Sequence, residues 1–453
     1  MTHPTPRPRT ASEPVRRQAT APVRGGPPPR SRVALALAGG GPLGAIYEIG
    51  ALCALDEALT GADLSNCDHY VGVSAGGFIA AGLANGMTPR ELCGMFITNQ
   101  PSGQDAFDPA WLMRPAYAEL AQRLSQLPGL GLQTLWAWTM GRKPLISALE
   151  KLAPAMPTGL FSNEEVHRQL ERLFSQAGRT NDFRQLPRRL TLVATHLDSG
   201  DAAPFGAPGW DHVPISRAIA ASAALPGLFP PVEIDGRYYV DGALKKTMHA
   251  SIALEEGVDV MFCLNPLVPF DATVPDVQRV GQRHGKPIPS MVEGGFPAVM
   301  SQTFRSMIHS RLELGMKHYE HSYPHTAIVL IEPDHRDPEL FLANTFSYRQ
   351  RRELAEHAYQ QTRLMLRTQH TTLSAKLRPH GIGLDHAVLS DPTRSLLGSP
   401  TASAKATPPG AVARRTPPQR RPPRQRLSQA LNRLQDSVDD LQHALAHGAV
   451  VRR

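Results

Sequence analysis

A serine between two glycines, directly after an apolar strand, constrains this chain more than any other feature. The predicted strand over 70–73 runs into Gly72-Val73-Ser74-Ala75-Gly76, and small and apolar residues suited to a helix follow. A strand that turns this tightly into a helix needs glycine on both sides of the serine, because side chains there would clash with neighbouring elements. The pattern predicts a nucleophile elbow, with Ser74 as the candidate nucleophile at a helix N-terminus that favours negative charge.

A glycine-rich loop follows the first predicted strand. Residues 33–38 are apolar without polar alternation, which predicts a strand buried on both faces. Gly39-Gly40-Gly41-Pro42-Leu43-Gly44 comes next, and apolar residues then recur at helical spacing up to Gly61, a predicted C-cap. This strand, loop and helix present backbone N–H groups to an anion.

Two functions can use that loop. The spacing Gly39-x-Gly41-x-x-Gly44 fits a dinucleotide-binding fingerprint, but that function requires an acidic residue at the end of the second strand, where this chain has Ser74. The alternative is an oxyanion hole, in which Gly39, Gly40 and Gly41 lie beside Ser74 at the carboxyl edge of a parallel sheet. We favour the oxyanion hole.

A third block supplies a candidate base. Residues 214–224 predict a helix rich in small residues, and the Pro-containing run 225–231 ends it. Two short strands then flank an Asp235-Gly236 turn, and the second strand ends in Asp241-Gly242-Ala243. A carboxylate at a strand end is well placed to meet another residue at a strand end, such as Ser74.

These blocks, in this order from Gly39 to Ala243, resemble the patatin-like phospholipase family. The resemblance covers about residues 33–260 and implies an α/β fold, a three-layer sandwich with a mostly parallel central sheet. It also implies a catalytic dyad of Ser74 and Asp241 without a histidine. Many relatives carry Arg or Lys where this chain has Leu43, so oxyanion binding rests on backbone N–H groups alone. The glycines and the alanine that support the motifs are Gly44, Gly72, Gly76, Gly242 and Ala243.

The predicted function is hydrolysis of lipid esters, chiefly of phospholipids, with Asp241 as general base and its pKa raised by partial burial. An acyltransferase or thioesterase using the same acyl-enzyme is one alternative, and a weakly active or inactive lipid-binding scaffold is another. A rival triad would use His380 or His386 as base. No cofactor and no metal are expected, because the four cysteines and the histidines show no ligand spacing.

The remaining blocks complete one predicted catalytic domain over 33–387, with a motif-bearing core over 33–260 and a helical and strand extension over 261–387. The mainly helical stretch 89–176 is predicted as core, with an acyl pocket or lid as the alternative, and Ser162 with Glu165 predicts a capping box. Strands are predicted near 258–264 and 326–331. Helices are predicted over 298–319 and from Ser347, where Gln350 stands in capping-box position.

The charge of the chain is concentrated in its ends. Residues 1–32 hold seven arginines and eight prolines against one acid, and residues 388–426 are again rich in Pro and Arg, so both are predicted to be disordered. The formal charge of +8 therefore leaves about −5 for residues 33–387, and no nucleic-acid-binding face is expected on the fold. Residues 427–447 predict a short amphipathic heptad helix.

These features also set the expected location and partners. No secretory signal and no apolar run of about 18 residues is present, so a cytoplasmic protein, peripheral to membrane, is predicted. The expected substrate is a lipid ester. The basic tails are predicted to attract anionic membrane, and the heptad helix to self-associate or to dock on a partner.

Overall fold

The computed structural model describes residues 30–98, 114–117, 121, 125, 157–271, 273, 291–293, 295–342 and 348–398, and the structural statements below concern those residues. The strands are β1 (Val33–Leu37), β2 (Leu59–Thr60), β3 (His69–Gly72), β4 (Arg189–His196), β5 (Ala202–Phe205), β6 (Val232–Ile234), β7 (Arg237–Asp241), β8 (Val260–Leu264), β9 (Ala327–Ile331) and β10 (Gly383–Leu384). The helices are α1 (Gly41–Ala58), α2 (Ala75–Ala84), α3 (Pro89–Phe96), α7 (Asn163–Phe174), α8 (Ile215–Ser222), α9 (Ser251–Glu255), α11 (Gly295–Ser322), α12 (Pro338–Leu342), α13 (Tyr348–Thr368), α14 (His370–Leu377) and α15 (His386–Ser390).

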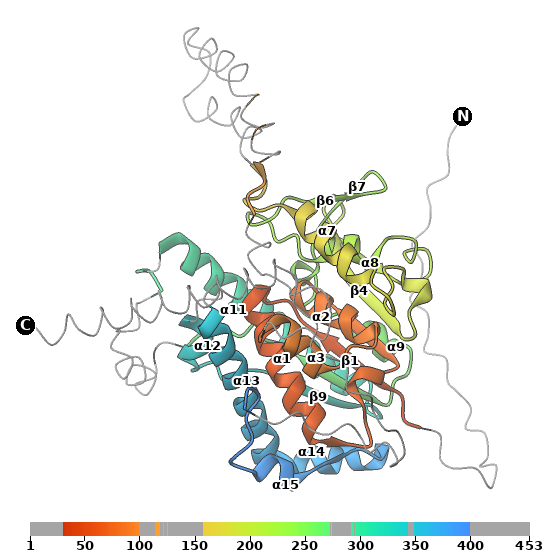
Figure 1. The fold of residues 1–453 in the computed structure, drawn as a ribbon, viewed down its shortest axis with the longest axis vertical. Coiled ribbons are helices and arrows are strands. Elements are labelled where there is room, and N and C mark those ends of the chain that lie inside the picture. The colour runs from red at the N-terminus through yellow and green to blue at the C-terminus, as the bar shows by residue number, and fades with distance from the viewer. Residues whose placement is uncertain are drawn as a thin grey trace, which may run out of the picture. The chain divides into compact units, whose positions relative to one another are not determined.

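An eight-stranded sheet forms the centre of the fold, in the order β6-β7-β4-β3-β1-β8-β9, with β5 paired to β4 (Figure 1). The strands β4, β3, β1, β8 and β9 pair in parallel, whereas β5, β6 and β7 add antiparallel pairs at one end. Every strand of the parallel part therefore ends at the same edge of the sheet, which we call the carboxyl edge.

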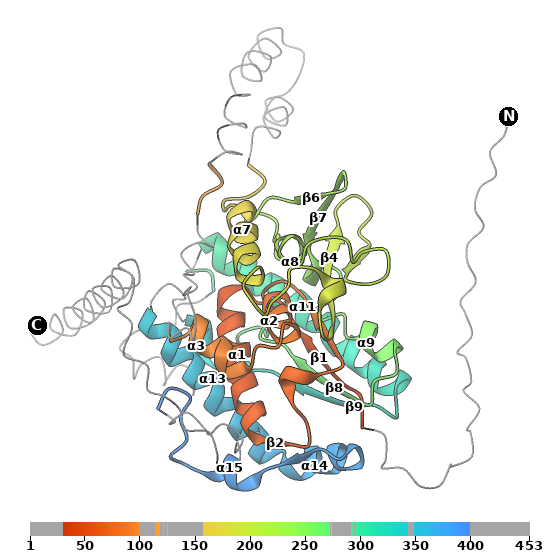
Figure 2. The same ribbon diagram turned by 45° about the vertical axis from the view of Figure 1, so that its right-hand side comes forward.

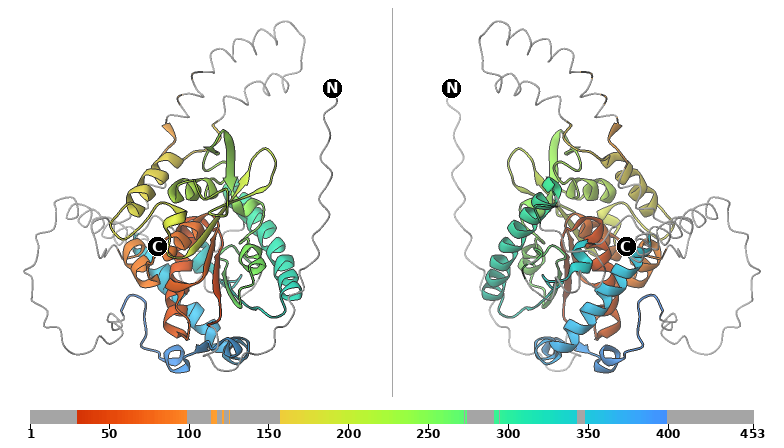
Figure 3. Two further views of the ribbon diagram at one scale, coloured as in Figure 1. Left: turned by 90° about the vertical axis from the view of Figure 1, so that its right-hand side faces the viewer. Right: turned by 90° about the vertical axis from the view of Figure 1, so that its left-hand side faces the viewer.

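Helices cover both faces of this sheet. The helices α1, α2, α3 and α13 lie on one face, and α9 and α11 lie on the other (Figures 2 and 3). The predicted fold class, an α/β three-layer sandwich with a mostly parallel central sheet, is confirmed.

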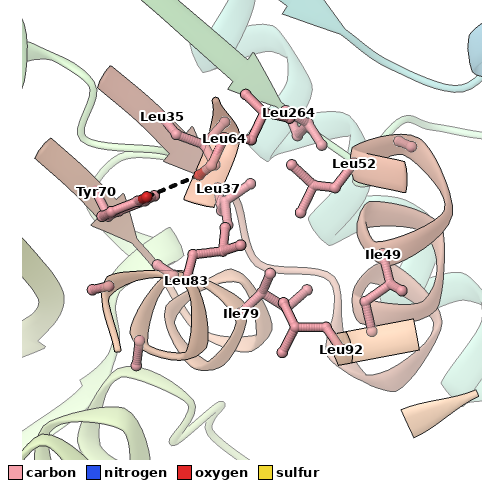
Figure 4. Close-up of a cluster of buried hydrophobic side chains, with 14 of the residues drawn as sticks. Leu35, Leu37, Ile49, Leu52, Leu64, Tyr70, Ile79, Leu83, Leu92 and Leu264 are labelled. Atoms are coloured by element: carbon pink, nitrogen blue, oxygen red, sulfur yellow. Dashed lines mark hydrogen bonds between the residues drawn. The ribbon is translucent and has the colours of Figure 1, made fainter. Parts of the chain in front are cut away.

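The strand β1 shows why the sequence selects this architecture. Its alternate residues Val33, Leu35 and Leu37 pack in the larger core beneath α1 (Figure 4), whereas Ala34 and Ala36 face the smaller core beneath α9 and α11. All five residues are buried, because a strand between two helical layers has no solvent face. The unbroken apolar run predicted this burial correctly.

Two local predictions are wrong. Helix α1 ends at Ala58, and Gly61 instead turns the chain after β2 with φ of 80°. Ser162 is the N-cap of α7, but its side chain makes no capping hydrogen bond. Glu165 is bound by Arg114 at 3.0 Å and Arg168 at 3.1 Å, so its carboxylate is committed elsewhere.

The fold extends beyond the boundary predicted at residue 387. Residue 388 lies inside α15, and Leu389 and Leu396 are buried. The guanidinium of Arg363 on α13 holds this segment by donating to the carbonyl oxygens of Val388 at 2.8 Å and Asp391 at 2.6 Å. Hydrogen bonds from one arginine to backbone carbonyls cannot be recognised from amino-acid composition, on which the predicted boundary was based.

Several predictions fall on residues outside the described part. These predictions concern most of the arm over 1–32, the linker beyond residue 398, the heptad helix at 427–447, most of the stretch 99–156 with its alternative as a lid, and the helix cap at Ser347. Among the described helices, none is long and apolar enough to cross a membrane.

Candidate functional site

The strand β3 ends in a sharp turn at Ser74, directly before α2. Ser74 adopts φ 54° and ψ −124°, a conformation that costs about 1–3 kcal/mol for a residue with a side chain. A Cβ at Gly72 would lie 2.5 Å from Gly77 Cα, and one at Gly76 would lie 2.4 Å from the carbonyl oxygen of Ala38. The tight turn therefore depends on both glycines.

The register of β4 brings Asp241 to the same place. The first half of β4 pairs with β3 as far as Leu192 opposite Gly72, and its second half pairs with β7, with Ala194 opposite Asp241. Ser74, two residues beyond Gly72, is thus level with Asp241. The Ser74 side chain lies close enough to the Asp241 carboxylate to lower its pKa, and the exposed fractions of these residues are only 7% and 4%.

The surroundings of Asp241 make it a stronger base than an exposed aspartate. Burial raises its pKa from 3.8 to about 6, although the hydrogen bond from the Ala243 N–H and the nearby Ser74 side chain act in the opposite direction. The Ala243 N–H donates to Asp241 Oδ1 at 2.8 Å. Gly242 allows this turn, because a Cβ there would lie 2.0 Å from the carbonyl oxygen of Val193.

Two residues that the sequence analysis did not single out hold the pair in place. Ser222, the last residue of α8, accepts a hydrogen bond from the Ser74 N–H at 2.8 Å and donates to the Val193 carbonyl at 2.6 Å. Thr195 on β4 donates to the Asp241 carbonyl at 3.1 Å. The sequence predicts this helix, rich in small residues, but nothing in its composition distinguishes Ser222 from Ser216.

The glycine-rich loop lies directly against the serine. A Cβ at Gly39 would be 2.9 Å from Ser74 Cβ and 3.4 Å from Ser74 Oγ. On the other side of the loop, a Cβ at Gly40 would be 2.7 Å from Pro266 Cγ, and one at Gly44 would be 2.9 Å from the same atom. A side chain at Gly39 would clash with Ser74, and one at Gly40 or Gly44 would clash with Pro266.

This loop presents unused hydrogen-bond donors at the start of α1. Within the described part of the chain, the N–H groups of Gly39, Gly40 and Gly41 donate to no backbone carbonyl. Free N–H groups at a helix N-terminus stabilise an anion, both as donors and through the helix dipole. The arrangement can therefore stabilise an oxyanion formed beside Ser74.

The histidines of the rival triad lie elsewhere. The chain around His380 and His386 packs against the C-terminal end of α1, where the Asp385 N–H donates to the carbonyl oxygen of Ala58 at 2.8 Å. The glycine-rich loop lies at the opposite end of that helix. His249 is nearer, but its ring contacts the Gly242 carbonyl at 3.3 Å, and burial lowers its pKa to about 4.

Across the described ranges, no group of three or more His, Cys, Asp or Glu side chains is arranged to hold a metal ion. The strand β3 is followed by Ser74 rather than by the acidic residue that a dinucleotide would need.

Comparison with known proteins supplies independent information. Residues 35–254 match the family model described as patatin-like phospholipase. Among solved structures, VipD from Legionella pneumophila aligns at 18% identity over 75% of this chain and 67% of VipD, with a TM-score of 0.33. The type III effector protein ExoU aligns at 15% identity over 79% of this chain, with a TM-score of 0.32, and this chain covers only 55% of ExoU.

Proposed function

Because the chain belongs, through residues 35–254, to the patatin-like phospholipase family of lipid acyl hydrolases, we propose that it cleaves acyl esters of phospholipids with Ser74 and Asp241 as a catalytic dyad. The observation that carries this proposal is the placement of Ser74 beside the buried Asp241 carboxylate, which the pairing of β4 with β3 and β7 brings about. A nucleophile within reach of its base is the arrangement that general-base activation requires.

Acylation begins with transfer of the Ser74 proton to Asp241 as Oγ attacks the ester carbonyl carbon. The carbonyl oxygen becomes an oxyanion, which the N–H groups of the loop from Gly39 to Gly41 stabilise. The tetrahedral intermediate then collapses: the ester C–O bond breaks, Asp241 returns the proton to the departing alcohol, and the acyl group stays on Ser74.

Deacylation repeats these steps with water. Asp241 takes a proton from the water that attacks the acyl-enzyme, and the same N–H groups stabilise the second oxyanion. Ser74 leaves with the proton held by Asp241, which restores the hydroxyl and releases the fatty acid.

The test of this proposal uses a soluble chromogenic ester, so that no lipid surface is needed. We expect the purified chain to hydrolyse it, and a fluorophosphonate to block the reaction by labelling Ser74, as found by mass analysis of the peptides. Hydrolysis that continues after complete labelling, or a label on another residue, would contradict the assignment.

The pH dependence of kcat/KM should report the base. Only the deprotonated carboxylate can accept the serine proton, so the rate should fall by about tenfold per pH unit below the Asp241 pKa of about 6 and be constant above it. Initial rates on the soluble ester from pH 4 to 9 measure this profile. Samples returned from pH 4 to pH 8 must regain full activity, which controls for unfolding. A rate independent of pH over the acid range would contradict the role of Asp241.

Adding one methyl group to the loop should slow the chemistry. In Gly39→Ala the new Cβ would lie 2.9 Å from Ser74 Cβ, so the loop or the serine must shift, and we expect kcat to fall by about 100-fold. Gly315→Ala is the matched control, because no atom lies within 4 Å of its added Cβ and alanine favours the helix there. Rates on the soluble ester and urea unfolding of both variants measure the effect. Equal rates for the two would show that the loop does not act on Ser74.

A further inference from the structure

A buried glutamate on α1 has no part in the chemistry described above. Glu48 has an exposed fraction of 0%, and the other buried residues of this helix carry no charge. Within the described part of the chain, neither of its carboxylate oxygens has a hydrogen-bond partner. Burying a polar group without a partner is costly, so the position of this side chain needs a physical reason.

Helix geometry places the Glu48 side chain behind the glycine-rich loop. Side chains of a helix point back toward its N-terminus, so Glu48 extends over Gly44, one turn earlier. Gly44 has no side chain to fill this space, and a Cβ there would lie 3.7 Å from the carbonyl oxygen of Gly39. Leu52, one turn later on the same side of α1, points toward Leu264 at the end of β8 (Figure 4). This side of the helix therefore faces the strand ends from which the loop begins.

The electrostatics of Glu48 indicate the same position. Burial raises its pKa well above the ordinary value, whereas the Ala38 N–H group lies close enough to act in the opposite direction. Ala38 directly precedes Gly39, and its N–H group donates to the Leu264 carbonyl at 3.0 Å. The carboxyl group thus lies at the junction between β1 and the glycine-rich loop, in surroundings that favour its uncharged form.

The loop has an unused acceptor on the side that faces α1. The Gly40 carbonyl accepts a hydrogen bond from the Gly44 N–H at 3.0 Å, but no backbone N–H group of the described residues donates to the Gly39 carbonyl. A carboxylate has no proton to offer this oxygen, whereas a protonated carboxyl group carries one O–H donor. An uncharged Glu48 and the Gly39 carbonyl are therefore complementary.

We propose that Glu48 is a positioning residue of the oxyanion hole: as an uncharged carboxylic acid it donates a hydrogen bond to the Gly39 carbonyl and holds the glycine-rich loop from behind. The inference rests on the proposed function, because that function assigns the N–H groups of the loop to the oxyanion.

The peptide bond between Gly39 and Gly40 transmits the effect of this contact. The bond is planar and trans, so its C=O and N–H groups point in opposite directions. Fixing the Gly39 carbonyl toward α1 turns the Gly40 N–H away from the helix, to the side where an oxyanion can bind. Consecutive glycines have little conformational preference of their own, so the loop gains from an anchor. An ionised Glu48 would instead repel both the carbonyl oxygen and the oxyanion.

The experiment compares two uncharged replacements of similar length. Glu48→Gln keeps a donor in its side-chain amide, so we expect its kcat on the soluble ester to stay within about threefold of wild type. Glu48→Met has no donor and leaves the loop without its anchor, so kcat should fall by at least about tenfold. KM should change by less than about threefold in both, because the loop acts on the transition state.

A second polar group on the same helix provides the control. Tyr47 is 3% exposed, and its hydroxyl lies near the Thr362 side chain on α13. Tyr47→Phe removes one buried polar atom from α1 without touching the loop, and it should keep the wild-type kcat. Urea unfolding of every variant identifies a loss of rate that comes from unfolding. Glu48→Leu, which also lacks a donor, takes the place of Glu48→Met if the methionine variant does not fold.

Infrared spectroscopy tests the charge of Glu48 without using activity. Ordinary carboxyl groups are ionised at pH 8, and so is Asp241, because its pKa is about 6. We expect the wild type at pH 8 to show the carbonyl stretch of a protonated carboxyl group, and Glu48→Gln to lack that band.

Three results would overturn the proposal. They are a wild-type kcat in the folded variant without a donor, a kcat of Glu48→Gln as low as that of Glu48→Met, and no band that Glu48→Gln removes. Rates of the wild type and of Ser74→Ala are measured alongside. An inactive wild type would refute the proposed chemistry and the positioning role with it. An active wild type that depends on Ser74 but not on a donor at position 48 would refute the positioning role alone.

Discussion

Replacing Ser74 by alanine is expected to reduce kcat on the soluble ester by at least about 10⁴-fold, with no change in fold. The loss is large because, in the proposed mechanism, Ser74 forms the acyl-enzyme, so without it the oxyanion donors have no covalent intermediate to stabilise. The free energy of unfolding should change by less than about 1 kcal/mol, because alanine keeps a Cβ in the same strained backbone conformation. Initial rates and urea unfolding measure the two quantities.

Glycine at the same position separates catalysis from strain. Ser74→Gly should be as inactive as Ser74→Ala, but more stable by about 1 kcal/mol, because glycine adopts φ of 54° without the penalty paid by a side chain. Ser199→Ala, at an exposed serine outside the site, should retain the wild-type rate. Residual activity of both Ser74 variants within tenfold of wild type would exclude this residue as the nucleophile.

The sequence predicted those parts of the site that depend on local chain geometry. Gly72, Gly76 and the glycine-rich loop are readable because close backbone contacts forbid a Cβ at each position, and the structure gives the contacts: Gly77 Cα, the Ala38 carbonyl and Ser74 itself. Burial of a strand on both faces could be predicted from an apolar run without polar alternation, which β1, β8 and β9 all show. Close backbone contacts and the burial of a strand on both faces can therefore be recognised from the order of the residues.

Tertiary hydrogen bonds leave no such trace. Ser222 reaches Ser74 from 148 residues away, and Arg363 binds carbonyls about 25 residues further on, so neither role has a local pattern. Glu48 is a clearer example, because it lies among the apolar positions of α1 and is fully buried, and within the described part of the chain neither of its carboxylate oxygens has a hydrogen-bond partner. Burial raises its pKa well above the ordinary value, and glutamate is a residue type that is ordinarily exposed.

The electrostatics of Asp241 give the last prediction, in which function and stability change in opposite directions. Asp241→Asn should reduce kcat by about 10⁴-fold, because the amide cannot accept the Ser74 proton. The variant should nevertheless be more stable than wild type at pH 8. The folded-state pKa of Asp241 is about 6 and its ordinary value is 3.8, so between these pH values the folded protein binds the proton that the unfolded chain has released.

The free energy of unfolding of the wild type therefore falls as pH rises from about 4 to 6 and keeps that deficit above pH 6, where a buried carboxylate is held charged. Asparagine carries no charge and removes the deficit, so we expect Asp241→Asn to gain about 1–3 kcal/mol at pH 8 and to lose this advantage by about pH 4. Urea unfolding of both proteins at pH 4 and pH 8 measures the difference. A variant less stable than wild type at pH 8, or a difference that does not depend on pH, would mean that the carboxylate is not buried at a cost and that the proposed base is an ordinary surface acid.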